Sequence, residues 1–203
     1  MTLKLRYMTY ADINQVVAID KESFETAWSS RSYAYEIGES TYSYMVVLDN
    51  NQPQPLTGWK RFIRSFGGNG HTPSQIVSYG GLWRIMDEAH ISTIATHVDW
   101  REQGYGEVVL AAMIRRAMLL GAYYIVLEVR VSNTAAQNLY HKYEFEIVDT
   151  KQKYYRDNNE DAYDMRLNLE DNAMRIRFQE RFEAIKARIL FDDSYTERER
   201  PRL

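Results

Sequence analysis

The chain has 203 residues and carries 25 Lys and Arg against 28 Asp and Glu, a formal net charge of −3 at pH 7. A content of 45% hydrophobic and 26% charged residues is typical of globular proteins and excludes disordered and fibrous classes. The absence of cysteine excludes disulfides, a thiol nucleophile and thiolate metal sites. No basic excess, paired histidine ligands or long apolar run appears, so we expect a cytoplasmic protein without metal, nucleic acid or membrane partners.

The first third of the chain predicts alternating strands and helices that end in a loop. The segment Thr9 to Asp12 resembles a capping box, with Asp in place of the usual Glu, and predicts a helix start. Glycines and a proline between strand-like runs predict a long loop farther on. In order, we expect a strand over 3–8, helices over 9–21 and 29–36, a strand over 42–48, a turn over 49–53 and a loop over 60–74.

The middle of the chain predicts a βαβ unit. A strand over 90–97 is followed by a glycine-punctuated turn over 101–106 and by a helix over 107–120 with one apolar face. A second strand is expected over 123–129. Because a crossover helix joins them, the two strands should be parallel.

The last part of the chain predicts a short helix, a hairpin and a long amphipathic helix. Ser132 and Asn133 should cap the short helix, which runs to about Tyr143, and the hairpin strands are expected over 145–155 and 162–167. Apolar residues then recur within a stripe roughly 80° wide, which predicts a helix packed on its own domain or, alternatively, a homodimer interface. The stripe comprises Met174, Phe178, Phe182, Ile185 and Ile189. We expect a domain over 1–169, and over 170–203 this helix and a frayed, solvated tail from Thr196.

The turn from Arg101 to Gly106 lies between a strand and a helix. Its glycines permit a tight turn that points backbone amides at the helix start, a place that favours anions such as phosphate. A Walker A sequence is absent, and the Rossmann pattern lacks its third glycine. Read alone, these six residues fit either a phosphate site or a plain turn.

Several motifs together resemble the GNAT superfamily of acetyl-CoA-dependent N-acetyltransferases. They are Arg101-x-x-Gly104-x-Gly106 after a strand, Glu128-Val129-Arg130 with Ser132-Asn133, Leu139-Tyr140 with Phe145, and Tyr154-Tyr155. The similarity is greatest to ribosomal-protein alanine N-acetyltransferases and spans about residues 3–169. It departs at Ala27, Val98, Glu102, Glu144 and Arg156. It implies an α/β fold with a mixed, mostly antiparallel sheet, a central parallel βαβ unit and helices on both faces.

The resemblance implies an acetyl-CoA site at the glycine turn and along the preceding strand. Turn amides would hold the pyrophosphate, while the pantetheine would lie beside the strand like an added strand. The implied cofactor-binding residues are Ile94, Ala95, Thr96, Arg101, Gln103, Gly104, Tyr105, Gly106, Asn133 and Tyr140.

Glu128 and Tyr140 are the candidate catalytic residues. A protein α-amine has a pKa near 7.7–8.0 and needs only a modest base, so we expect Glu128 to accept its proton, directly or through water. The Tyr140 phenol is suited to protonate the departing thiolate. Pairing of Glu128 with Arg130 or another cation, and simple packing of Tyr140, are the structural alternatives.

The acceptor is expected between the segment 24–35 and the hairpin 154–162. Phe24, Trp28, Tyr154 and Tyr155 are the candidate substrate-binding residues, while Asp157, Glu160 and Asp161 are candidates to attract a basic peptide. We expect transfer of acetyl to a protein or peptide N-terminus. A small-amine acetyltransferase and a non-catalytic acyl-CoA-binding regulator are the alternatives.

Overall fold

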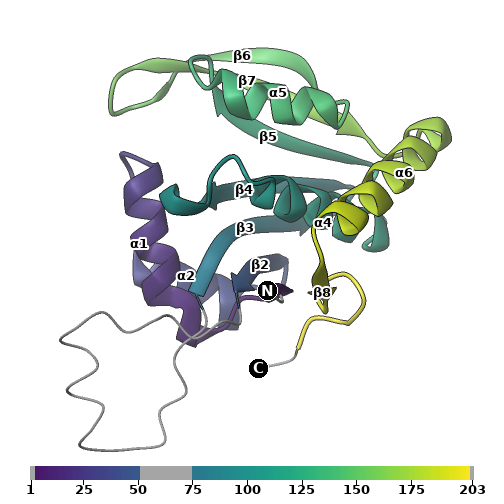
Figure 1. Ribbon diagram of the computed structural model, residues 1–203. Helices are drawn as coiled ribbons and strands as arrows, with labels where there is room; N and C mark the ends of the chain where they lie inside the picture. The colour runs from purple at the N-terminus through teal and green to yellow at the C-terminus, as the bar shows by residue number, and fades with distance from the viewer. Residues whose placement is uncertain (1–2, 51–74, 202–203) are drawn as a thin grey trace, which may run out of the picture.

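A computed structural model describes residues 3–50 and 75–201, in which all strands join one mixed sheet (Figure 1). The strand order is β6-β7-β5-β4-β3-β2-β1-β8, and only the β4–β5 and β1–β8 pairs are parallel. The strands are β1 (Leu3–Tyr7), β2 (Ser43–Asn50), β3 (Gln75–Ile85), β4 (Glu88–Thr96), β5 (Tyr124–Arg130), β6 (Glu146–Tyr155), β7 (Glu160–Asn168) and β8 (Phe191–Asp193).

Helices cover both faces of this sheet. On one face, α1 and α2 pack on β2 and β3 in a cluster that includes Val16, Tyr33 and Tyr79. On the other, α4 and α6 share the larger core with β4, β5 and β7. The helices are α1 (Ile13–Ser23), α2 (Ser30–Gly38), α4 (Tyr105–Leu119), α5 (Thr134–Lys142) and α6 (Asn172–Arg188), with short 3-10 turns η1 (Tyr10–Asp12) and η3 (Val98–Trp100). None of the helices in the described ranges is long and apolar enough to cross a membrane.

Strand β4 contains a bulge that changes its course. Gly81 of β3 pairs with Thr93, whereas the next residue, Leu82, pairs with Ile91, so Ser92 is the extra residue. A bulge bends its strand and shifts which side chains face each side. The parallel β4–β5 ladder accordingly extends only from Glu88 to His90 on β4, although β4 continues to Thr96. The two strands therefore separate at the centre of the sheet.

The predicted α/β class, the mixed sheet and the central βαβ unit are confirmed. The main deviation in this unit is that α4 begins at Tyr105 rather than at residue 107, because Gly104 takes the N-cap position. Asn133 caps α5 as predicted, and its side chain accepts from the Ala136 amide at 3.1 Å. The predicted loop over 60–74 and most of the turn over 49–53 lie outside the described residues, while Asp49 and Asn50 belong to β2.

The apolar stripe of α6 packs on its own chain. Met174, Phe178, Phe182 and Ile185 are at most 3% exposed and belong to the larger core. This packing favours the interpretation that the stripe packs on its own domain over the interpretation that it forms a homodimer interface. The division of the chain at residue 170 stays a prediction.

The expectation of a frayed tail after Thr196 was wrong for the described part of this segment. After α6, β8 adds to the sheet edge beside β1, and Tyr195 and Thr196 are buried. The Arg200 guanidinium then donates to the carbonyls of Ser40 at 2.7 Å and Ile37 at 2.9 Å at the end of α2. A cation at a helix C-terminus satisfies carbonyls that have no partner within the helix, so the tail is held on the domain.

Removing this cap should destabilise the protein. Arg200→Ala is expected to lower the free energy of unfolding by about 1–2 kcal/mol, because it deletes charge-assisted hydrogen bonds to two or more carbonyls. Arg198→Ala, at an exposed arginine two residues earlier, is the matched control. It should change the free energy of unfolding by less than about 0.5 kcal/mol. Urea unfolding of the three proteins measures both values, and equal loss in the two variants would contradict the capping role.

Candidate active site

The start of α4 presents backbone amides that no side chain caps. Gly104 is the N-cap residue, with a left-handed φ of 84°, and makes no side-chain cap hydrogen bond. The first-turn amides of a helix have no partner within the helix, and together with the helix dipole they favour an anion. A Cβ at Gly104 would lie 3.0 Å from the Ile189 Cδ1, so glycine is required here by both conformation and space.

Of the predicted side chains of the glycine turn, Arg101 and Gln103 lie on the surface around this helix start, whereas Tyr105 does not. Arg101 donates to the Thr96 carbonyl at 3.1 Å and to the Ser23 hydroxyl at 3.2 Å, which ties the turn to β4 and α1. Tyr105 is buried against Trp100, whereas Gln103 and Glu102 are exposed. Glu102 has a left-handed φ of 61°. An anion at this turn would therefore be bound by backbone amides rather than by a cluster of cationic side chains.

The edge of β4 beyond the bulge faces the opening toward β5. Ile94, Ala95 and Thr96 pair with β3 on one side, but the ladder to β5 has ended by this point. Backbone polar groups in such an opening are available to an extended ligand with amide groups, as in the addition of a strand to a sheet edge. Thr96, the last of these three predicted residues, lies close to the start of α4, since a Cβ added at Gly106 would lie 3.0 Å from its Oγ1.

Glu128 lies on β5 in a paired environment. Its carboxylate oxygens lie 2.8 Å from His90 Nε2 and 2.6 Å from Lys151 Nζ, and its side chain is 14% exposed. The hydrogen bonds from His90 and Lys151 outweigh burial and lower the pKa of Glu128 to about 2. In the part of the chain that the structure describes, Glu128 pairs with Lys151 and His90, while Arg130 pairs with Asp157 and Glu160 instead. The carboxylate is therefore ionised at neutral pH and accepts hydrogen bonds from cationic or neutral donors.

Tyr140 lies on α5 and is 6% exposed, with its ring 5.8 Å from that of Phe145. Burial raises the pKa of its phenol above the ordinary value, so the hydroxyl is protonated at neutral pH. Asn133, at the opposite end of α5, uses its side-chain oxygen as the helix cap. Tyr140 thus has the protonation state that a proton donor needs.

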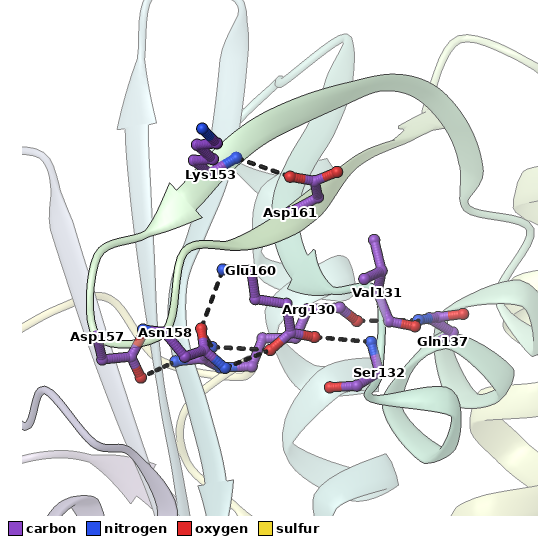
Figure 2. Close-up of polar contacts among 9 residues, drawn as sticks. All are labelled: Arg130, Val131, Ser132, Gln137, Lys153, Asp157, Asn158, Glu160 and Asp161. Atoms are coloured by element: carbon purple, nitrogen blue, oxygen red, sulfur yellow. Dashed lines mark hydrogen bonds and ion pairs between the residues drawn. The ribbon is translucent and has the colours of Figure 1, made fainter.

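A polar cleft of about 400 Å³ lies between the end of α1 and the β6–β7 hairpin, where the acceptor was expected. Phe24 lines it, as do Glu22 and Glu25 on one side and residues of the hairpin on the other. Figure 2 shows how the hairpin acids are engaged: Asp157 and Glu160 lie 2.5 Å and 2.9 Å from the Arg130 guanidinium.

Arg130 and local amides reduce the free negative charge of this cleft. Hydrogen bonds from Ser132 and Arg130 lower the pKa of Glu160 to about 2. Asp161 accepts from the Lys153 amide at 2.7 Å (Figure 2). Attraction of a basic peptide would therefore depend on the remaining carboxylates, Glu22 and Glu25, more than on the three predicted acids.

The predicted aromatic residues divide between two places. Trp28 stacks on Trp83 at 6.1 Å and packs near Tyr33, whereas Phe24 is 38% exposed beside the polar cleft. On the hairpin, Tyr154 is 44% exposed, and the Tyr155 ring lies under the Arg130 guanidinium at 3.8 Å. Phe24 and Tyr154 thus offer more exposed surface than the other two.

Sequence analysis missed three side chains of this site: His90, Lys151 and Trp83. His90 and Trp83 contact each other edge to face at 5.5 Å, and Lys151 bridges Glu128 and Asp164. The alternation of side chains along a strand could have placed His90 and Ser92 on one face of β4. Only the register between β4 and β5, however, shows that His90 lies beside Glu128. In the described parts of the chain, no group of His, Asp and Glu side chains forms a metal site.

Comparison with known proteins shows the family of the chain. A family model described as "Acetyltransferase (GNAT) family" matches residues 13–145. The chain belongs to the GNAT family. It is 31% identical over 158 residues to a putative ribosomal protein bS18-alanine N-acetyltransferase of Bacillus subtilis, which covers 78% of this chain and 90% of the relative. It is also 46% identical over 83 residues to the N-alpha-acetyltransferase daf-31 of Caenorhabditis elegans, 39% and 44% of the two chains.

Solved structures of this GNAT fold superpose on most of the chain. The ribosomal-protein-S18-alanine N-acetyltransferase from Escherichia coli matches with a TM-score of 0.64 at 23% identity, over 83% of this chain and 94% of that one. NAA60 of Arabidopsis thaliana in complex with acetyl-CoA matches with a TM-score of 0.66 at 12% identity, over 84% and 100%. The chain is thus an N-acetyltransferase of the GNAT family, and the predicted enzyme class is confirmed.

Proposed function

We propose that this GNAT enzyme transfers the acetyl group of acetyl-CoA to the α-amine of a protein N-terminus, of the ribosomal-protein alanine type. The observation that carries the proposal is the opening between β4 and β5. It begins beside His90 and Glu128 and leads along the free edge of β4 to the uncapped start of α4. In this proposal, the free edge of β4 would connect a site for phosphate at the start of α4 with a site for proton transfer at Glu128.

The residues along this path fit acetyl-CoA. The amides of Gln103 to Gly106 would hold the pyrophosphate, since Gly104 leaves them without a side-chain cap. The β4 edge at Ile94 to Thr96 would hold the pantetheine amides, with Asn133 and Tyr140 nearby on α5. When bound, acetyl-CoA supplies the activated acetyl group.

An N-terminal α-amine suits the acceptor side of this site. Its pKa near 7.7–8.0 leaves a fraction neutral at physiological pH, whereas a lysine amine near 10.4 would need a stronger base. The B. subtilis relative is named for action on ribosomal protein alanine, and the polar cleft beside Phe24 and the β6–β7 hairpin lies at the surface. A short extended peptide would reach Glu128 through this cleft.

Within the proposal, Glu128 provides the negative charge at the point where the amine loses its proton, and Tyr140 protonates the departing thiolate. The low pKa of Glu128 and the raised pKa of Tyr140 keep the first ionised and the second protonated near pH 7. Phe24, Trp28, Tyr154 and Tyr155 are proposed to line the acceptor path. The proton donor and the ionised carboxylate thus come from different elements, α5 and β5.

A panel of acceptors tests the proposed acceptor class. Release of free thiol from acetyl-CoA is measured with peptides that begin with alanine, with the same peptides blocked at the N-terminus but carrying lysine, and with spermidine. Unblocked alanine peptides should be acetylated with a kcat/KM at least about tenfold above that of the others. Preference for spermidine would support the small-amine alternative, and no release with any acceptor would support a non-catalytic acyl-CoA-binding protein.

Substitution of Gly104 tests the phosphate cradle. Gly104→Val places a β-branched side chain at φ 84° against Ile189 and displaces the α4 amides. The KM for acetyl-CoA should rise about tenfold or more, equivalent to at least 1.4 kcal/mol of lost binding. Gly121→Ala, at a glycine with a similar φ of 69° and no atom within 4 Å of an added Cβ, is the matched control for backbone strain. An unchanged KM in the folded Gly104→Val protein would contradict the cradle.

Tyr140→Phe separates proton donation from packing, because it removes one oxygen and keeps the buried ring. A donor role predicts a fall in kcat of about 10²-fold or more with acetyl-CoA still bound. A packing role predicts only a loss of stability, of a few kcal/mol at most. Thermal melts and steady-state kinetics on the same preparation measure both, and a destabilised but fully active variant would remove Tyr140 from the mechanism.

A further inference from the structure

His90 occupies the position on β4 where the two parallel strands part. It is the last β4 residue that pairs with β5, opposite Val126, and the bulge at Ser92 follows directly. Its side chain is 23% exposed, and its Nε2 atom lies 2.8 Å from the Glu128 carboxylate. An imidazole is thereby fixed at the apex of the opening that the acetyl group and the acceptor would enter.

The Glu128 carboxylate itself is poorly suited to take a proton. One oxygen contacts His90, and the other contacts Lys151, which also lies 2.9 Å from Asp164. These hydrogen bonds lower the pKa of Glu128 to about 2, far below the pKa of an amine that has to be deprotonated near neutral pH. An efficient general base has a pKa closer to the working pH, as a histidine does.

The contact with Glu128 selects one form of the neutral imidazole. A carboxylate that stays ionised only accepts, so the Nε2 atom of His90 carries the hydrogen and donates it. The Nδ1 atom then has a free lone pair, and it has no hydrogen-bond partner among residues 3–50 and 75–201. This is the arrangement in which a carboxylate orients a histidine that accepts a proton through its other nitrogen.

Two side chains contact His90, and these two together with their own partners come from four strands and a helix. Glu128 on β5 is the charged group in contact, and behind it lie Lys151 on β6 and Asp164 on β7. On β3, the Trp83 ring packs against the imidazole, while its Nε1 donates to Glu36 of α2 at 3.0 Å. Trp83 therefore restricts the rotation of the ring without offering a competing acceptor.

We propose that His90 is the catalytic residue that accepts the proton of the attacking amine, and that Glu128 is the positioning residue that orients its ring. The inference rests on the proposed function and names the proton acceptor within it. As the amine nitrogen forms its bond to the acetyl carbon, the carbon–sulfur bond breaks and its electron pair stays on sulfur. The proton lost from nitrogen goes to Nδ1 of His90, and the sulfur takes a proton, so the products are an amide and a thiol.

The pH profile of the wild-type enzyme provides the first test. Two protonations would then stop the reaction, one on the free amine and one on the imidazole. On the acid side of the profile, log(kcat/KM) for an alanine peptide should therefore fall with a limiting slope near 2. A slope near 1 down to pH 5 would overturn the proposal, because then the amine alone titrates in this range.

His90→Gln provides the second test, since its amide can still donate to Glu128 but has no basic nitrogen. We expect kcat/KM to fall about 10²-fold or more and the acid slope to drop to about 1. Binding of acetyl-CoA, measured by calorimetry, and the melting temperature should stay near wild type. His141→Gln removes an exposed imidazole from α5 and is the matched control, with wild-type rate and slope. His90→Gln with more than a third of the wild-type kcat/KM and an unchanged slope would overturn the proposal.

Glu128→Gln distinguishes the two residues if His90→Gln does not fold. With His90 as acceptor, the slope stays near 2 and the acid limb moves to lower pH, because a negative charge that favours the imidazolium is lost. With Glu128 as acceptor, the rate falls without that displacement, which would overturn the proposal. If the wild type acetylates only spermidine, the proposed acceptor class fails, while the same slopes measured with spermidine still test His90.

Discussion

The separation of β4 from β5 is the constraint on which the rest of the site depends. It follows from one extra residue, Ser92, which bends β4 immediately after its last pairing with β5. The antiparallel ladder to β3 continues on the other side of β4, so the strand keeps its place in the sheet while one edge becomes free. The end of β4 lies against the first turn of α4, where a Cβ added at Gly106 would lie 3.0 Å from Thr96 Oγ1, so the free edge and the helix amides are neighbours. His90 and Glu128 face each other where the two strands begin to separate.

The segment after β7 is built into the enzyme rather than appended to it. Glu144 has a left-handed φ of 67° where the resembling family commonly has glycine, and its carboxylate is held at 2.6 Å by both Arg177 and Arg181 of α6. Arg188, at the end of α6, lies 2.7 Å from Glu107 in the first turn of α4. Ion pairs from α6 thus fix both the strained turn after α5 and the helix that would bind phosphate. The two residues that compensate for the departure from glycine at position 144, Arg177 and Arg181, both belong to α6.

Sequence reasoning predicted what depends on local pattern and missed what depends on register. The βαβ unit, the glycine turn and the Asn133 cap follow from periodicity and from residues with strong conformational preferences. The bulge at Ser92 was missed because it is defined by the pairing of β4 with β3, which sequence pattern does not report. Without the registers between neighbouring strands, His90 could not be placed beside Glu128, and Lys151 could not be identified as the partner of that carboxylate. The short strand β8 and the Arg200 cap were missed because both are stabilised by residues more than 150 positions away in the sequence.

In the proposed mechanism, acetyl-CoA occupies the opening between β4 and β5 and places its pyrophosphate at the start of α4. Amide hydrogen exchange with and without saturating acetyl-CoA tests this directly, since it reports backbone hydrogen bonds that a ligand forms or shields. The account predicts slower exchange in peptides that cover Ile94 to Thr96 and Gln103 to Gly106, with little change in β1 and β8. Unchanged exchange in both segments, or protection confined to another part of the protein, would contradict it.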